Sequence, residues 1–467
     1  MYLAAKYLPR GSDMKMLWLA LSIISQRALA QNAQAVTAQS NTWNSTLTLN
    51  EDQISRAGLD NATAERVNLA IPPANSSTLP PGSLLSVEYY TNTTLYTIPP
   101  NTAMSRILFQ SETANGTAVP ASAYVLWPWM PRTDPKTGRL AVVGWGHGTS
   151  GTFGDCAPSH IRNLWYQYSA PYILALQGYI VVAPDYAGLG VTHDPRGEKI
   201  KHTWMAANAS ANDLFHSVKA AQDAFPELSS RFVLMGHSQG GQAAWAAAER
   251  QARRPVDGHL GTIAGSPVTD IELQLQLYPH LAALIGPFAA AGLNSVLPEY
   301  SAADFLTEAG LRRFELFEEL KGCNNIAWVL WDEPGLVRAD LLNTSALQAF
   351  KPLARLGGRP IGGPLLVLHG TVDSLVPPQL STQAVDETCT NYPESQLEFA
   401  LFNGTDHVPT LYAGQRIWLD WNADRFADKE ILPGCVRRNY SSYHPQESYQ
   451  ATGNYYLEYA TQPFQVA

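Results

Sequence analysis

The sequence predicts an α/β fold in which helices cover both faces of a mostly parallel sheet, and three observations carry this prediction. Short apolar runs alternate with helical patterns from Leu140 onward, which is typical of parallel strands connected by helices. At residues 231–250 a buried strand, a sharp turn and an alanine-rich helix follow one another. With 467 residues, of which 45% are hydrophobic, the chain can also bury a large core.

The N-terminus carries the pattern of a secretory signal peptide. The apolar run at residues 16–24, MLWLALSII, follows Lys15, and the small residues of Ala-Leu-Ala at 28–30 form a cleavage signal. The run is too short to span a bilayer. We therefore expect residues 1–30 to be removed and the mature protein to be secreted.

Cysteines and glycosylation sequons fit an oxidising compartment. The chain has four cysteines, none in a CxxC pair, which favours two disulfides over a metal site and leaves three connectivities open. Asn-x-Ser/Thr sequons recur along the chain, as in a secreted glycoprotein. The cysteines are Cys156, Cys323, Cys389 and Cys435, and the sequon asparagines are Asn44, Asn61, Asn75, Asn92, Asn115, Asn208, Asn343, Asn403 and Asn439.

The charge pattern argues against a nucleic-acid partner and against a polybasic membrane anchor. The formal net charge is −9, and the sequence has no basic run. A nucleic-acid partner and a polybasic membrane anchor both require clustered Lys and Arg, so we expect neither.

Several parts of the chain can be assigned in order. Residues 31–100 should form a leader that is largely polar, and an antiparallel hairpin then opens the sheet. Residues 265–359 have helical spacing without a strong strand signal, and we expect a cap over the carboxyl edge of the sheet. The core is thereby divided into residues 101–264 and 360–432, and residues 433–467 form a C-terminal tail. The expected strands are Ala103–Ser111, Ala121–Pro128, Leu140–Gly146, Tyr179–Asp185, Phe232–Met235, Pro364–Leu368 and Leu397–Phe402, and the expected helices are Ile161–Leu176, Met205–Ala224, Gln239–Arg250 and Leu411–Phe426.

Ser238 stands at the apex of the strand–turn–helix unit. Gly236 and Gly240 bracket it in GHSQGG, and a side chain at either glycine would collide with backbone in so tight a turn. The pattern G-x-S-x-G alone is weak, but the flanking strand and helix make it a nucleophile elbow. We expect Ser238 to be a catalytic nucleophile.

A serine nucleophile needs a base and an acid that orients the base. Asp373 follows a buried strand in HGTVDSLVP, and His407 follows the next strand in GTDH. The order serine, acid, histidine, each after a strand, is that of an α/β hydrolase. Ser238, Asp373 and His407 are therefore the expected triad.

Other acids and histidines are weaker candidates. Asp332 and Asp340 lie in the cap pattern, and Asp406 is expected to be a loop or capping residue beside the base. Asp185 precedes the serine and should organise a turn that supports the site. His369 should point into the sheet edge, and His444 lies in the tail.

The tetrahedral intermediate of such a reaction needs backbone N–H donors for its oxyanion. Gln239 follows the nucleophile and supplies one. The second is expected from the glycine-rich loop GWGHGTSG, from Thr149 or, as second choice, Ser150. The loop lacks the GxGxxG register of a dinucleotide site, so we expect no cofactor and no metal.

Together, HGTSG, DCAPS, PDYAGLG, GHSQGG, HGTVDSLVP and GTDH resemble the secretory lipases of the lipase-A type in the α/β-hydrolase superfamily. The resemblance runs from about residue 81 to residue 428; the leader and tail lie outside it, and the cap matches only in character. It implies the same triad, a cap that faces lipid, and the disulfides Cys156–Cys323 and Cys389–Cys435.

The expected function is therefore a secreted serine ester hydrolase that acts on acylglycerols or related lipid esters, with transient contact to a lipid interface. A short-chain carboxylesterase shares every catalytic residue. A serine peptidase of the same fold would need cap carboxylates to hold a substrate amine, for which Glu318 and Glu319 are available. A non-catalytic binding protein is the remaining alternative, against which the ordered triad argues.

Overall fold

The computed structural model describes residues 72–73, 76–331 and 333–450. The expected signal peptide and the sequons at Asn44, Asn61 and Asn75 lie outside these residues. In the described part, a 10-stranded sheet has the order β1-β2-β3-β5-β4-β6-β7-β8-β9-β10. The strands are β1 (Leu84–Glu88), β2 (Ala103–Glu112), β3 (Ala118–Trp127), β4 (Leu140–Gly146), β5 (Ile180–Pro184), β6 (Leu228–His237), β7 (His259–Gly265), β8 (Leu365–Gly370), β9 (Leu397–Phe402) and β10 (Cys435–Tyr440).

The sheet is antiparallel at one end and parallel over the rest. β1, β2, β3 and β5 pair antiparallel in turn. From β5 through β4 to β10 every pairing is parallel. This arrangement confirms the predicted fold class, a mostly parallel sheet that begins with an antiparallel hairpin.

Helices cover both faces of the sheet. One hydrophobic cluster joins α5 (Ala207–Ala224), α6 (Gln239–Arg253) and α12 (Pro378–Asn391) to one face. A second cluster joins α4 (Pro171–Leu176), α13 (Pro409–Ala413) and α14 (Gln415–Phe426) to the other. The alanines of α6 from Ala243 to Ala248 are fully or almost fully buried, which lets this helix lie close to the central strands.

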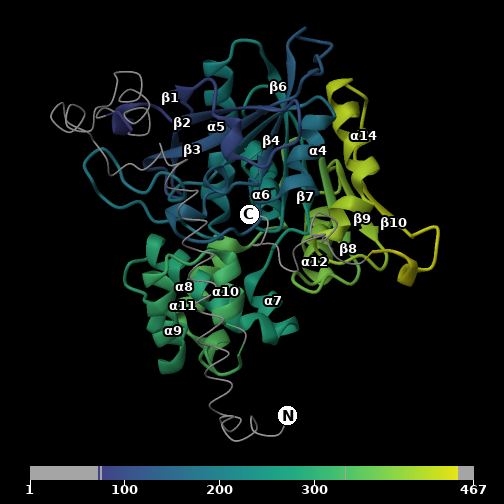
Figure 1. The fold of residues 1–467 in the computed structure, drawn as a ribbon. Helices are drawn as coiled ribbons and strands as arrows, with labels where there is room; N and C mark the ends of the chain where they lie inside the picture. The colour runs from purple at the N-terminus through teal and green to yellow at the C-terminus, as the bar shows by residue number, and fades with distance from the viewer. Residues whose placement is uncertain (1–71, 74–75, 332, 451–467) are drawn as a thin grey trace, which may run out of the picture.

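The segment between β7 and β8 forms a helical cap with a core of its own. Its helices are α7 (Ile271–Leu277), α8 (Ala282–Val296), α9 (Glu308–Glu319), α10 (Asn324–Leu330) and α11 (Ser345–Ala354). They share a third hydrophobic cluster that includes Phe288, Phe317 and Phe350. Figure 1 shows these helices gathered on one side of the sheet domain.

Two predicted helices differ from the structure. The helix expected at Ile161–Leu176 is present only as α4; before it, Leu164, Trp165 and Gln167 have positive φ values, which an α-helix does not allow. The helix expected at Leu411–Phe426 is divided at Gly414 into α13 and α14. A Cβ at Gly414 would lie 2.8 Å from the ring of Phe402, so the break allows close packing on β9.

Four elements were not predicted: β1, β7, β10 and α12. β1 lies within the expected leader, and β10 opens the expected tail by adding an edge strand beside β9.

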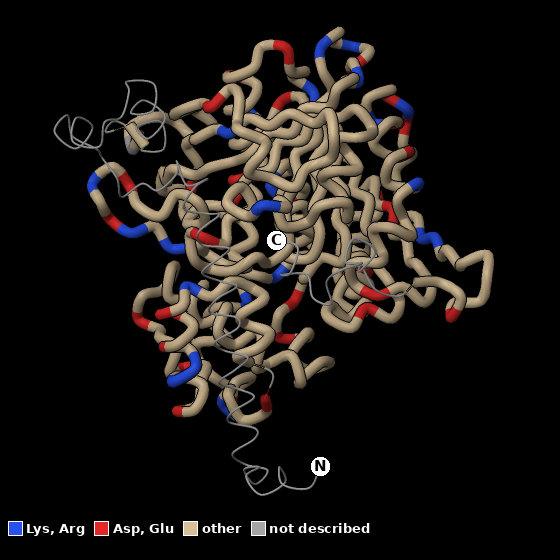
Figure 2. The backbone as a smooth tube through the Cα atoms, viewed as in Figure 1, with Lys and Arg blue, Asp and Glu red and all other residues tan. Residues whose placement is uncertain are grey.

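Charge is dispersed over the described surface. In Figure 2, Lys and Arg alternate with Asp and Glu along the outer loops and cap helices, while the centre of the molecule is largely uncharged. Among the described residues, no helix has both the length and the apolar character needed to cross a bilayer.

Candidate active site

Ser238 joins β6 to α6 with a φ of 61° and a ψ of −120°. Its N–H donates to the carbonyl of Gly265, 2.9 Å away. A Cβ at Gly240 would lie 2.0 Å from the carbonyl oxygen of Gly146, and one at Gly236 would lie 2.1 Å from that of Gly240. Only glycine therefore fits on either side of a turn that holds serine in a strained conformation.

Asp373 and His407 meet at the carboxyl edge of the sheet, on the loops after β8 and β9. His407 Nδ1 lies 2.8 Å from Asp373 Oδ2. The other oxygen, Oδ1, accepts the N–H groups of Leu375 and Val376 at 3.0 and 2.8 Å. Both carboxylate oxygens are therefore engaged, and the imidazole is held with Nδ1 toward the acid.

The electrostatics keep Asp373 ionised. Burial raises the pKa of its carboxyl, but the charge of His407 and hydrogen bonds from His369 and His407 outweigh burial and hold this pKa well below its usual range. A buried carboxylate at Nδ1 favours the imidazolium that forms when a histidine accepts a proton at Nε2.

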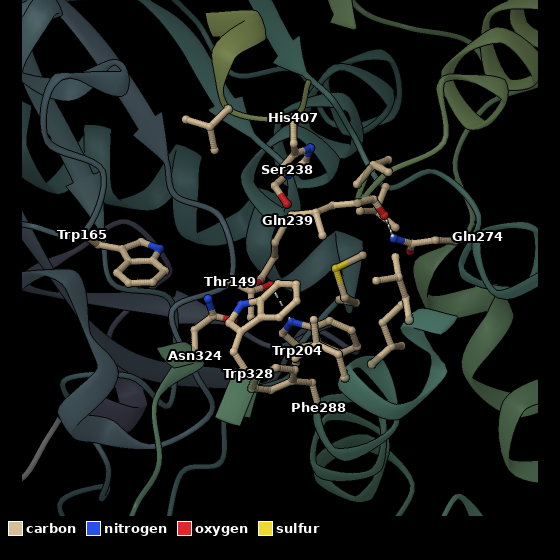
Figure 3. Close-up of a pocket in the computed structure, with 18 of the residues that line it drawn as sticks. Thr149, Trp165, Trp204, Ser238, Gln239, Gln274, Phe288, Asn324, Trp328 and His407 are labelled. Carbon is tan, nitrogen blue, oxygen red and sulfur yellow. Dashed lines mark hydrogen bonds between the residues drawn. The ribbon is translucent and has the colours of Figure 1, made fainter. Parts of the chain in front are cut away.

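Ser238 and His407 line one cavity of about 630 Å³ between the sheet and the cap. Figure 3 shows the two side chains next to each other at its wall, above Gln239 and Thr149. The cap contributes apolar side chains, and Asn324, Asn325 and Gln167 contribute polar ones. The apolar lining includes Ile271, Leu281, Leu284, Ile285, Phe288 and Trp328.

The two expected oxyanion residues contact each other beside the serine. Gln239 is the first residue of α6, so its N–H has no acceptor within the helix and is available to a ligand. The hydroxyl of Thr149 lies 2.9 Å from Gln239 Oε1. Ser150, the second choice, is also close, and its carbonyl accepts the N–H of Asn324 in the cap at 2.8 Å.

His237 is a site residue for which the sequence predicted no role. Its Nε2 lies 3.1 Å from the carbonyl oxygen of His407, and its Nδ1 lies 2.7 Å from the hydroxyl of Tyr166. Burial and the neighbouring charge of His407 hold the pKa of His237 well below its usual range, so the ring is neutral. Since a carbonyl only accepts, Nε2 carries the proton and Tyr166 donates to Nδ1. The sequence did contain one indication of this role, since His237 directly precedes Ser238.

His369 also belongs to the site. We expected it to point into the sheet edge, but its Nε2 lies 3.3 Å from Asp373 Oδ2 and 2.9 Å from the carbonyl of Val376. Ser381 Oγ lies 2.7 Å from its Nδ1. His369 therefore helps to hold the acid loop.

The competing acids have other partners. Asp406 accepts the N–H groups of Ser374 and His407, both at 2.7 Å, as a loop-holding residue does. Asp185 accepts the N–H and hydroxyl of Ser159 at 2.8 and 2.6 Å, beneath the site. Asp340 pairs with Arg338 on the surface, and Asp332 lies outside the described residues.

A second cavity of about 720 Å³ lies between the cap and the loop after β5. Glu315, Glu318 and Lys321 line it, as does His202 from the core. Of the two acids proposed to hold a substrate amine, Glu318 thus faces this second cavity and is absent from the lining of the one that contains Ser238. In the described ranges, no group of His, Cys, Asp and Glu is arranged to hold a metal ion.

Both disulfides implied by the resemblance are present. Cys156–Cys323 ties the loop after β4 to the start of α10, and Cys389–Cys435 ties α12 to β10.

Several proteins similar in sequence to this chain are lipases. Lipase 5 of Candida albicans is 24% identical over 319 residues, which cover 60% of this chain and 64% of that protein. Lipase 10 of the same yeast is 22% identical over 410 residues, 79% of this chain and 83% of that protein. The match thus spans just under two thirds of the length of Lipase 5.

Solved structures show the same fold. Candida antarctica lipase A has a TM-score of 0.61 at 18% identity, with 79% of this chain and 88% of that chain covered. The rice cell wall degrading esterase LipA from Xanthomonas oryzae has a TM-score of 0.59 at 16% identity, with 75% and 100% covered. The family model described as Secretory lipase matches residues 158–434, which is more than half of the sequence. The chain belongs to the secretory lipase family.

Proposed function

We propose that this protein is a secreted serine hydrolase that cleaves acylglycerols or related lipid esters through an acyl-enzyme. One observation carries the proposal. Ser238, in a strained conformation, lines the same cavity as His407, which is hydrogen-bonded to Asp373, and the cap side of this cavity is apolar. Membership of the secretory lipase family supports the same reaction class.

In the proposed reaction, Ser238 Oγ attacks the ester carbonyl while His407 Nε2 takes the hydroxyl proton. Asp373 holds Nδ1–H and stabilises the imidazolium. The N–H groups of Gln239 and Thr149 stabilise the oxyanion. The imidazolium then protonates the departing alcohol, and water hydrolyses the acyl-enzyme with His407 again as base.

The cavity lining supports a lipid-like acyl group. An acyl chain buried against the apolar side of this cavity would be stabilised by about 0.8 kcal/mol for each methylene group. The cap residues on this side are Ile271, Leu281, Leu284, Ile285 and Phe288. Asn324 and Asn325 add polar side chains to the lining, which could bind the alcohol group.

Secretion is supported by the two disulfides and by the exposure of sequons. All sequon asparagines within the described ranges are exposed: Asn92, Asn115, Asn208, Asn343, Asn403 and Asn439. They could accept glycans without unfolding the chain.

The peptidase alternative loses its main support because Glu318 lines the other cavity. An esterase for short, dissolved substrates remains a real alternative, since it would use the same triad and oxyanion donors.

The test is hydrolysis of short-chain and long-chain glycerol esters, each measured across its solubility limit. Rates that rise above the limit for long chains support a lipase, whereas activity confined to dissolved short esters indicates an esterase. Ser238→Ala should lower kcat by about 10⁶, as removal of a nucleophile does in comparable triads. A purified, folded variant that keeps more than about a tenth of the activity would contradict the assignment of Ser238.

A further inference from the structure

A continuous chain of hydrogen bonds runs through the two oxyanion residues. Trp204 Nε1 donates to Thr149 Oγ1 at 2.9 Å, and Thr149 Oγ1 donates to Gln239 Oε1 at 2.9 Å. Gln239 Nε2 lies 3.1 Å from His202 Nε2, and His202 Nδ1 lies 3.1 Å from the carbonyl oxygen of Ala187. Figure 3 shows Trp204, Thr149 and Gln239 in line beneath Ser238.

The direction of every bond in this chain is determined by its two ends. An indole N–H only donates, and a carbonyl oxygen only accepts. His202 must therefore carry its proton on Nδ1 and accept the Gln239 amide at Nε2, which leaves Gln239 Oε1 to accept from Thr149. Burial lowers the pKa of His202 to about 4, in agreement with a neutral ring. The hydroxyl proton of Thr149 is thus committed to Gln239, and only its backbone N–H is free for substrate.

Trp204 also belongs to the interior of the cap. It lies in the core segment just before α5, but its indole is part of the cap's hydrophobic cluster. The ring centroid lies 5.6 Å from that of Phe288 on α8 and 6.1 Å from that of Phe350 on α11, with an interplanar angle of 10° in the second pair. A Cβ at Gly292 of α8 would lie 2.7 Å from the carbonyl oxygen of Trp204. Trp204 is therefore packed against both α8 and α11 of the cap.

We infer that Trp204 is a positioning residue that makes the oxyanion site depend on the position of the cap. With the cap packed as observed, the indole N–H holds the Thr149 hydroxyl in the orientation that fixes the Gln239 side chain. With the cap displaced, Thr149 and Gln239 lose this restraint. The inference rests on the proposed function, since it concerns the donors of that reaction.

The first test is a double-mutant cycle with a dissolved short-chain ester. Trp204→Phe keeps an aromatic ring against Phe350 but removes the donor, and Thr149→Val removes the hydroxyl. Each should lower kcat about fivefold to tenfold, the range for a lost neutral hydrogen bond. Because both changes break the same chain, the double variant should be no slower than Thr149→Val alone.

Trp127→Phe is the matched control. It removes an indole bond of equal length, 2.9 Å to Ser105 Oγ, at a position far from the cavity along the sheet order. Its kcat should stay within twofold of wild type. If Trp204→Phe behaves like this control, or if the effects of Trp204→Phe and Thr149→Val multiply, the inference is wrong. Should Trp204→Phe not fold, Thr149→Ser must retain the kcat that Thr149→Val loses.

A second cycle tests the link to the cap. Phe350→Leu alters the packing on the indole from α11, without lining the catalytic cavity. It should lower kcat in the wild-type background and have no further effect when Trp204 is already Phe. An equal effect in both backgrounds, or none in either, would overturn the dependence on the cap.

A readout other than activity separates this inference from the proposed function. The indole N–H proton of Trp204 should exchange slowly in wild type and faster in Thr149→Val, measured by NMR with Trp127 as internal reference. If wild type hydrolyses no ester but exchange changes as expected, the proposed function fails and the hydrogen-bond chain stands. If wild type is active but exchange is unchanged, the inference alone fails.

Discussion

Removal of either disulfide should lower the free energy of unfolding, but only one of the two removals should also lower kcat. Cys156–Cys323 closes a loop with a sequence separation of 167, and Cys389–Cys435 closes one of 46. In the chain-entropy model a bridge restricts the unfolded chain more when its loop is longer, which gives about 5 kcal/mol for the first and about 4 kcal/mol for the second. Serine pairs at each bridge should therefore lower the free energy of unfolding by amounts that differ by about 1 kcal/mol.

The two bridges differ much more in their distance from the candidate site. Cys156 is fully buried, and a Cβ at Gly151 would lie 2.5 Å from its sulfur, so the bridge packs against the loop that carries Thr149. On the cap side, Asn324 follows Cys323 directly and donates its N–H to Ser150. Cys389–Cys435 instead joins α12 to the edge strand β10.

We therefore expect both serine pairs to lower stability but only Cys156→Ser/Cys323→Ser to lower kcat. Urea unfolding gives the free energies, and hydrolysis of a short ester at a temperature where both variants are folded gives kcat. Equal losses of kcat in the two variants, or a loss only at Cys389→Ser/Cys435→Ser, would refute the reasoning from position.

Two further predictions concern the elbow and acid pH. Gly240→Ala should abolish activity and lower the melting temperature sharply, because its Cβ would lie 2.0 and 2.4 Å from backbone atoms of Gly146. Gly116→Ala is the control: it has open space around it and should lower the free energy of unfolding by only about 1–2 kcal/mol, because of its positive φ. A Gly240→Ala variant that is active would contradict this prediction. The free energy of unfolding should also fall as the pH drops from 6.5 towards 4. Five buried histidines stay neutral in the folded protein over this range, whereas in the unfolded chain they take up a proton near pH 6.5. Each of them should therefore lower the free energy of unfolding by up to about 1.4 kcal/mol per pH unit, and their full stabilising effect is present above pH 6.5. The raised pKa values of Asp185, about 6, and Asp213, about 7, oppose it, so urea midpoints that rise on acidification would show that the aspartates dominate. Burial lowers the pKa of the histidines concerned to about 4 for His147, His202, His216 and His259, and to about 3 for His160.

Strands that are buried on both faces were predictable, and strands without a continuous apolar run were not. β4, β5 and β8, and the part of β6 from Phe232 to Met235, are short apolar segments in the centre of the sheet. β10, at the edge, reads CVRRNY, which has neither an apolar run nor regular alternation; Arg437 pairs with Asp386 and Arg438 with Glu398. β7 contains two glycines, one of which, Gly261, packs against the ring of Trp421. The sequence of β7 alone does not predict a strand; in the fold it is held between β6 and β8.

The first half of the helix predicted at Ile161–Leu176 is replaced by a segment with other contacts. This half has the apolar spacing of a helix, but its side chains are used elsewhere. Trp165 Nε1 donates to the carbonyl of Gly148 at 3.1 Å, and Tyr166 donates to His237. The same segment has positive φ values at Leu164, Trp165 and Gln167, which an α-helix does not have. Contacts with the rest of the fold override the local periodicity, and the segment lines the cavity that contains Ser238.

The same distinction explains which site residues could be found from sequence. Ser238, Asp373 and His407 each follow a strand end, and a topology that brings strand ends together also brings these residues together. His202 and Trp204 lie well beyond the end of β5 and belong to no motif, yet they determine how Gln239 and Thr149 are held. Their role arises where the cap meets the loop after β5, and the cap resembles the family only in character. A chain with the same triad motifs but a different cap would therefore need a different way to hold its oxyanion residues, and differences in rate among such enzymes should follow the cap more closely than the motifs.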